Sequence, residues 1–139
     1  MKVSRRSLMM SAAGAAAIWS ASLVAVHSAP RALPARTDEA GGVRVVVKPK
    51  SVLPGAVWTF EVAMDTHVKP LESDMTKSAA LIVGKARYSP VSWKGDAAGG
   101  HHRKGTLSFP APAEPAASFT LEFDGIGGVA KRSFSWPAP

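Results

Sequence analysis

The residues from Ala56 to Met64 (AVWTFEVAM) place a large apolar side chain at every second position. These side chains belong to Trp58, Phe60, Val62 and Met64. Successive side chains of a β-strand point to opposite faces of a sheet, so a period of two predicts a strand with one buried face. A helix would need apolar residues every three or four positions. The stretch therefore requires a sheet whose apolar side is covered by a second layer.

Shorter strand-like runs, separated by turn residues, occupy most of the remaining chain. They cover Val43–Lys48, Ala79–Val83, Arg87–Trp93, Gly105–Phe109, Ser118–Phe123 and Val129–Trp136. Pro90 makes its run an edge strand or a broken strand. About seven short strands without a helical period predict an all-β fold, a single antiparallel β-sandwich of immunoglobulin-like type over residues 43–139. A small closed barrel is the alternative.

The first 29 residues have the layout of an export signal. Lys2, Arg5 and Arg6 precede an uncharged stretch from Leu8 to Val26 that is rich in Ala, Gly and Ser. The sequence around Arg5 and Arg6 (SRRSL) resembles the twin-arginine signal. That resemblance implies export of an already folded protein to the periplasm or the cell exterior. A single transmembrane anchor is the alternative, and residues 30–42 are expected to form a flexible linker.

Charge and composition narrow the possible partners. The 139 residues include 17 Lys and Arg, 10 Asp and Glu, and no Cys. The missing Cys exclude disulfides, Cys-based zinc sites and iron–sulfur clusters. Removal of the signal leaves 14 bases against 10 acids, and they are scattered along the chain. We therefore expect no nucleic-acid partner and, once the signal is removed, no membrane contact. No feature of the sequence identifies a protein partner.

Every His outside the signal lies in one of two segments, residues 64–74 and residues 93–105. The first segment directly follows the alternating strand. Imidazole is the commonest protein ligand for zinc and copper, and a carboxylate can bind the ion or orient an imidazole. The sequence thus predicts a copper or zinc site built from His67, His101, His102, Asp65 and Asp74. A thioether from Met64 or Met75 would favour copper, although Met64 is in phase with the buried face.

The metal site depends on the backbone around His101 and His102, and a different function is also compatible with these residues. Neighbouring residues in a regular strand point to opposite faces, so His101 and His102 reach one ion only where the backbone is irregular, which Gly99 and Gly100 permit. The alternative is a non-catalytic structural or protein-interaction module in which the His and Asp residues form a polar network. No motif marks a nucleophile or a phosphate-binding loop, so an enzyme is not the favoured interpretation. If the protein is an enzyme, the only reaction that these residues suggest is one carried out by a metal-activated water.

The two His segments also carry a resemblance. The first reads Asp65-Thr66-His67, then Leu71 and Asp74, and the second runs GGHHR.G.L.F from Gly99 to Phe109. Together they resemble small exported bacterial and archaeal proteins of unassigned function, in which both segments recur in one domain. The resemblance spans roughly residues 43–136. It implies that the two segments act together in one fold, and it implies no activity.

Overall fold

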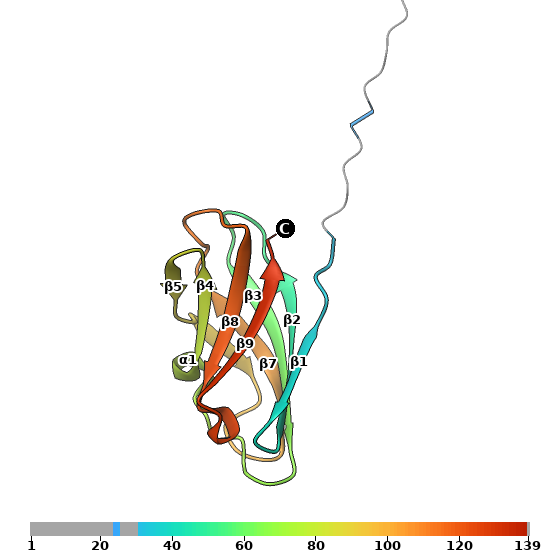
Figure 1. Ribbon diagram of the computed structural model, residues 1–139, viewed down its shortest axis with the longest axis vertical. Coiled ribbons are helices and arrows are strands. Elements are labelled where there is room, and N and C mark those ends of the chain that lie inside the picture. The colour runs from blue at the N-terminus through green and yellow to red at the C-terminus, as the bar shows by residue number, and fades with distance from the viewer. Residues whose placement is uncertain (1–23, 26–30, 139) are drawn as a thin grey trace, which may run out of the picture.

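The computed structural model describes residues 24–25 and 31–138 (Figure 1). Apart from Val24 and Ala25, the predicted export signal lies outside these residues. Within them the regular secondary structure is almost entirely β-strand, as predicted, and the strands form two antiparallel sheets rather than one closed barrel. The described part of the chain contains no helix long and apolar enough to cross a membrane.

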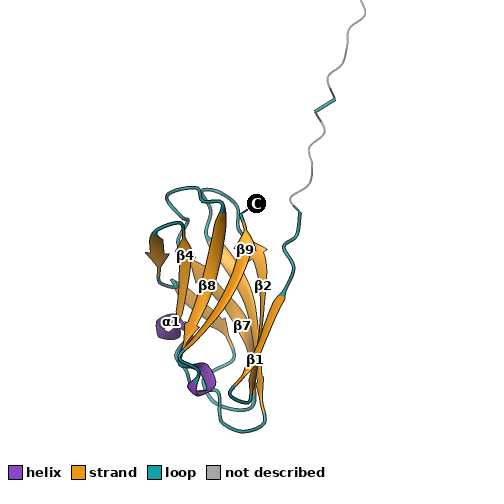
Figure 2. Ribbon diagram, viewed as in Figure 1, coloured by secondary structure: helices purple, strands orange, loops and turns teal. Residues whose placement is uncertain are grey.

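The larger sheet has five strands. In spatial order they are β1 (Arg36–Ala40), β2 (Val43–Ser51), β3 (Trp58–Thr66), β7 (His102–Phe109) and β6 (Ser92–Gly95). The smaller sheet contains β5 (Ala86–Tyr88), β4 (Ala79–Val83), β8 (Ser118–Asp124) and β9 (Lys131–Pro137). Two short helices, α1 (Met75–Ser78) and the 3-10 helix η1 (Ile126–Gly128), lie in the connections (Figure 2).

The described residues form nine strands, where the sequence predicts about seven. One difference is the run around Pro90, which divides into β5 and β6 on different sheets. Proline has no N–H to donate to a sheet ladder, and the chain leaves the smaller sheet near this position. The other difference is β1, which lies within the predicted linker.

The structure corrects part of the flexible linker predicted over residues 30–42, because residues 36–42 form a strand and a turn. Residues Arg36–Ala40 form β1 and pair along their whole length with β2. Gly41 and Gly42 have φ angles of 59° and 74°, a left-handed conformation that closes the tight turn between the two strands. β1 is held in place by backbone hydrogen bonds and ion pairs rather than by buried side chains. It therefore does not need the apolar periodicity by which the other strands are predicted.

The core lies between the two sheets and is dominated by aromatic rings. Trp58 and Phe60 of β3 face Phe119 and Trp136 of the smaller sheet, with ring centroids 5.0–6.2 Å apart. Burial of a large apolar side chain contributes about 1.5–3 kcal/mol. The alternation predicted for residues 56–64 is confirmed, because these large side chains are all buried. Met64 continues the same face and is buried with them.

A buried arginine fastens β1 to the second sheet. The Arg132 side chain, in β9, is fully buried, and its Nη1 donates to Asp38 Oδ2 at 2.6 Å and to the Val43 carbonyl at 3.1 Å. Its Nη2 donates to the carbonyls of Ala40 at 2.7 Å and Ile126 at 3.0 Å. Nearby, Trp136 Nε1 donates to the Pro34 carbonyl at 2.7 Å. Residues of β9 therefore hold β1, the strand that the apolar pattern of the sequence does not predict.

Replacing Arg132 by Met should destabilise the fold by about 2–3 kcal/mol, because the buried carbonyls and Asp38 would lose charged donors. Urea unfolding of the full chain measures the loss. Lys85→Met, at an exposed turn position, is the matched control and should change stability by less than about 0.5 kcal/mol. Equal stability of the two variants would contradict the role given to Arg132.

Glu122 on β8 should contribute to the pH dependence of stability. A hydrogen bond from Arg87, at 2.9 Å, and the nearby Lys131 ammonium hold the pKa of Glu122 below its usual range. The unfolded chain therefore binds the proton more readily, and the stabilisation present above the unfolded pKa is lost as pH falls through the folded one. We expect Glu122→Gln to flatten the decline in urea midpoint under acid conditions. Glu114→Gln, on an exposed loop, should leave that decline as it is.

Candidate functional site

The two His segments lie side by side at one end of the sandwich. Three backbone hydrogen bonds join them: Thr66 N–H to the His101 carbonyl, Leu71 N–H to the Gly100 carbonyl, and Gly99 N–H to the Leu71 carbonyl, at 2.8–2.9 Å. The first continues the β3–β7 ladder by one residue beyond Asp65 and His102. The position of one segment is therefore fixed relative to the other.

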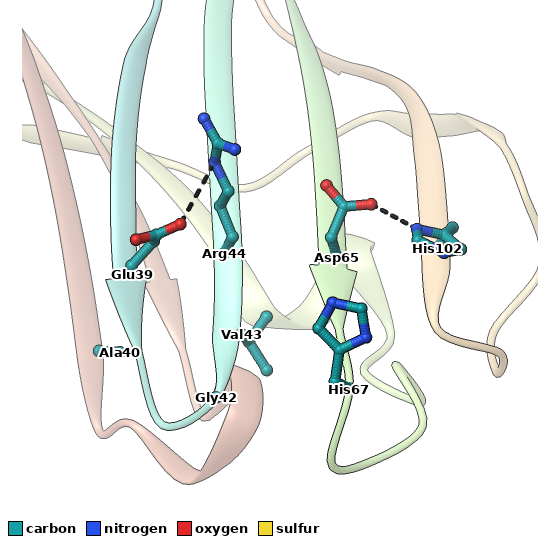
Figure 3. Close-up of a pocket in the computed structure, with 8 residues that line it drawn as sticks. All are labelled: Glu39, Ala40, Gly42, Val43, Arg44, Asp65, His67 and His102. Carbon is teal, nitrogen blue, oxygen red and sulfur yellow. Dashed lines mark hydrogen bonds and ion pairs between the residues drawn. The ribbon is translucent and has the colours of Figure 1, made fainter.

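An open depression of about 560 Å³ lies beside this junction, where the β1–β2 turn meets the end of β3 and the start of β7 (Figure 3). Its lining consists of Glu39, Ala40, Gly42, Val43, Arg44, Asp65, His67 and His102. The His102 side chain is 74% exposed and that of Asp65 is 46% exposed. The polar groups of the depression are therefore accessible to a solute.

Asp65 and His102 face each other directly across β3 and β7. His102 Nδ1 lies 2.5 Å from Asp65 Oδ1. An ionised carboxylate only accepts hydrogen bonds, so Nδ1 is the donor. In the neutral imidazole this leaves the Nε2 lone pair free for a ligand. Metal-binding histidines commonly show this arrangement, in which a carboxylate orients the ring through the other nitrogen.

His67 follows Asp65 by two residues and lines the same depression. Figure 3 shows its ring turned toward Asp65, with His102 across the gap between the strands. The chain turns here because buried Thr66 accepts hydrogen bonds from the amides of Val68 and Lys69. His67 lies directly after the end of β3, and its side chain and that of His102 line the same depression. Two imidazoles that line one depression are a pair of candidate ligands for one ion.

Two of the predicted ligands do not line the depression. His101 precedes His102, and its carbonyl accepts the hydrogen bond from Thr66. Asp74 caps α1, where its Oδ1 accepts hydrogen bonds from the Thr76 amide at 3.0 Å and the Thr76 hydroxyl at 2.7 Å. These bonds hold the pKa of Asp74 below its usual range. The structure therefore brings together Asp65, His67 and His102.

The predicted thioether ligands are likewise placed elsewhere. Met64 and Met75 are both buried in the hydrophobic core, and neither lines the depression. Within residues 24–25 and 31–138, no group of three or more His, Asp or Glu side chains is arranged to hold a metal ion. The depression thus offers two imidazoles and one orienting carboxylate, with its outer side open.

Arg103 supports the site from the interior. It follows His102 on β7 and is buried, and burial lowers the pKa of its guanidinium. Its Nη1 donates to the carbonyls of Leu71 and Ser73, at 3.3 and 2.5 Å, and its Nε donates to the Asp96 carbonyl at 3.2 Å. The guanidinium also lies over the Trp93 ring, with Cζ 5.3 Å from the centroid. Arg103 therefore ties both His segments to the sheet.

Sequence reasoning missed Arg103, and it also missed Glu39 and Arg44. Arg103 shares the inward phase of Leu107 and Phe109, and an arginine in a buried phase is the pattern that would have revealed it. Glu39 and Arg44 form an ion pair at 3.5 Å, directly opposite each other in β1 and β2. Glu39 was hidden by the assignment of its segment to a linker.

Replacing Arg103 by Met should loosen the junction of the two His segments without unfolding the sheets. Its charged donors to Leu71 and Ser73 would be lost, so amide hydrogen exchange at Leu71 and Gly99 should accelerate about ten-fold or more. Lys104→Met changes the next residue, which points to solvent, and should leave exchange at Leu71 and Gly99 unchanged. The two variants are distinguished by NMR of the full chain. Unaltered exchange in Arg103→Met would show that the backbone bonds suffice.

The functional assignment depends on this geometry, because no family model, no curated protein and no solved structure matches the chain significantly.

Proposed function

We propose that this protein binds a divalent transition metal, zinc or copper, in the depression formed by the two His segments. His102 would supply Nε2 and His67 a second ring nitrogen, while Asp65 orients His102. The observation that carries the proposal is the 2.5 Å contact between His102 Nδ1 and Asp65, with His67 lining the same depression.

The available donors determine the class of ion. Imidazole nitrogen and carboxylate oxygen suit Zn(II) and Cu(II), whereas Cu(I) prefers thiolate and thioether ligands. The chain has no Cys, and Met64 and Met75 are buried in the core. The carboxylate of Asp65 at the same depression helps to offset the charge of a dication, whereas that of Glu39 is paired with Arg44. Two imidazoles fill half of a tetrahedral shell and leave the remaining positions to water or another ligand.

The second candidate function is a structural or interaction module without metal. It is favoured by the polar network itself, in which Asp65 bonds His102 while Glu39 pairs with Arg44. In this case the network serves to order the ends of β1, β2, β3 and β7. The two functions differ in which property a His102 substitution alters: metal affinity in the first, stability in the second.

We also propose that the sandwich is of the immunoglobulin-like type. The strand orders β2-β3-β7-β6 and β5-β4-β8-β9 correspond to the ABED and C′CFG sheets of that fold. On this assignment β1 is an additional strand beside strand A. The inter-sheet disulfide of antibody domains has no counterpart, since the chain contains no Cys.

We further propose that the protein is exported before it binds metal. Residues Lys2, Arg5 and Arg6 followed by an uncharged stretch support a twin-arginine signal over residues 1–29, with delivery of the folded domain to the periplasm or the exterior. A protein without Cys gains nothing from an oxidising compartment, so a stable core formed before export is consistent with its composition.

Isothermal titration of the full chain with Zn(II) and Cu(II) tests the metal site. We expect one ion per chain, and a loss of affinity of about ten-fold or more in His67→Ala and in His102→Ala. Asp65→Asn should weaken binding by about ten-fold, because His102 would lose its orienting carboxylate. His101→Ala is the matched control, since His101 is exposed and does not line the depression.

Two results would reject the metal site. One is the absence of binding heat for both ions, and the other is equal affinity in His67→Ala, His102→Ala and the His101→Ala control. If the same His102→Ala chain then unfolded at lower urea concentration than the control, the structural module would be the better description.

A further inference from the structure

The depression supplies only half of the ligands of a tetrahedral metal site. His67 and His102 supply two nitrogens, and among residues 24–25 and 31–138 no third ligand completes a metal cluster. Glu39 lines the same depression, and its carboxylate is 69% exposed. Neighbouring strands of a sheet are about 4.8 Å apart, so Glu39 and His102, at opposite ends of four adjacent strands, are about 14 Å apart. Glu39 therefore cannot share an ion with His102 of its own chain.

These residues belong to a row that crosses the outer face of the larger sheet, which we call the charge row. Its members are direct cross-strand partners in β1, β2, β3 and β7: Glu39, Arg44, Asp65 and His102. Their order along the row is acid, base, acid, imidazole. Within the chain, Glu39 and Arg44 form an ion pair, and His102 Nδ1 donates a hydrogen bond to Asp65. A row with this order sets each acid against a base or an imidazole of its own reversed copy.

Only one two-fold arrangement of two such faces uses this property. An axis parallel to the strands, running between β2 and β3, reverses the row and sets Arg44 against Asp65 of the second copy and Glu39 against His102 of the second copy. An axis along the row would instead set each charge against its own like. Further along the same strands, Lys48 and Glu61 are also cross-strand partners. The axis parallel to the strands also sets Lys48 of one copy against Glu61 of the other.

We propose that a second copy of this chain completes the metal site: in a symmetric dimer, Glu39 of the second copy binds the ion held by His67 and His102, an inference that rests on the metal binding proposed above. The dimer contains two equivalent ions. Each ion has two nitrogen ligands from one chain, one carboxylate oxygen from the other, and one remaining position for water. Zinc with three protein ligands and a water is an established coordination pattern.

Sedimentation velocity of the full chain with EDTA or with equimolar Zn(II) tests the dimer. We expect a monomer in EDTA and a dimer in zinc, with one ion per chain. Glu39→Gln removes the bridging carboxylate and should weaken zinc-dependent dimerisation about ten-fold or more. Glu72→Gln, an exposed carboxylate outside the charge row, is the control and should dimerise as the parent does.

A mixing experiment separates a bridging role from a structural one. The Glu39→Gln chain retains its histidines, and the His102→Ala chain retains Glu39, so each homodimer has two defective sites. One complete site forms only when the two chains pair. Zinc should therefore dimerise the mixture about ten-fold more strongly than either variant alone, with one ion per mixed dimer.

The outcomes distinguish this inference from the proposed function. Zinc that binds to a persistent monomer overturns the dimer and leaves the metal site in place. Absence of zinc binding overturns both proposals. An equal amount of dimer in EDTA and zinc, full dimerisation of Glu39→Gln, or no gain on mixing overturns the bridging role of Glu39.

Discussion

The pairing register of β3 with β7 is the constraint on which the rest of the structure depends. It sets Asp65 opposite His102 and, at the other end, Trp58 opposite Phe109. Because side chains alternate between faces, a slip by one residue would turn the aromatic side chains outward and the site residues inward. On the other side of β7, Gly105 lets β6 pair closely with it, since a Cβ there would lie 2.6 Å from the Trp93 ring and 2.8 Å from the Gly95 Cα. The core and the depression are consequences of the same alignment.

Apolar periodicity predicts the parts of this fold that apolar burial stabilises. The alternating strand around Phe60 and the all-β class follow from the sequence, because each buried strand carries its own pattern. β1 carries none, since it is held by ladder bonds and by Arg132, which lies 94 and 92 residues from its β1 partners Asp38 and Ala40. Long-range polar contacts of this kind leave no local trace in the sequence.

The candidate site divides in the same way. The sequence places the two His segments in one region and proposes Asp65, His67 and His102, which the structure gathers at one depression. It does not separate these from His101, because strand alternation at that position depends on where β7 begins. Asp74 was an equally plausible ligand by residue type, yet it caps a helix of four residues. Local backbone geometry, rather than residue chemistry, decides between a ligand and a cap.

The bonds from β9 to the segment around β1 join the two ends of the domain. Arg132 and Trp136 reach Asp38, Ala40 and Pro34, between 92 and 102 residues earlier. These contacts can form only once β9 has been synthesised, so the docking of the first described strand on the second sheet depends on the last described strand.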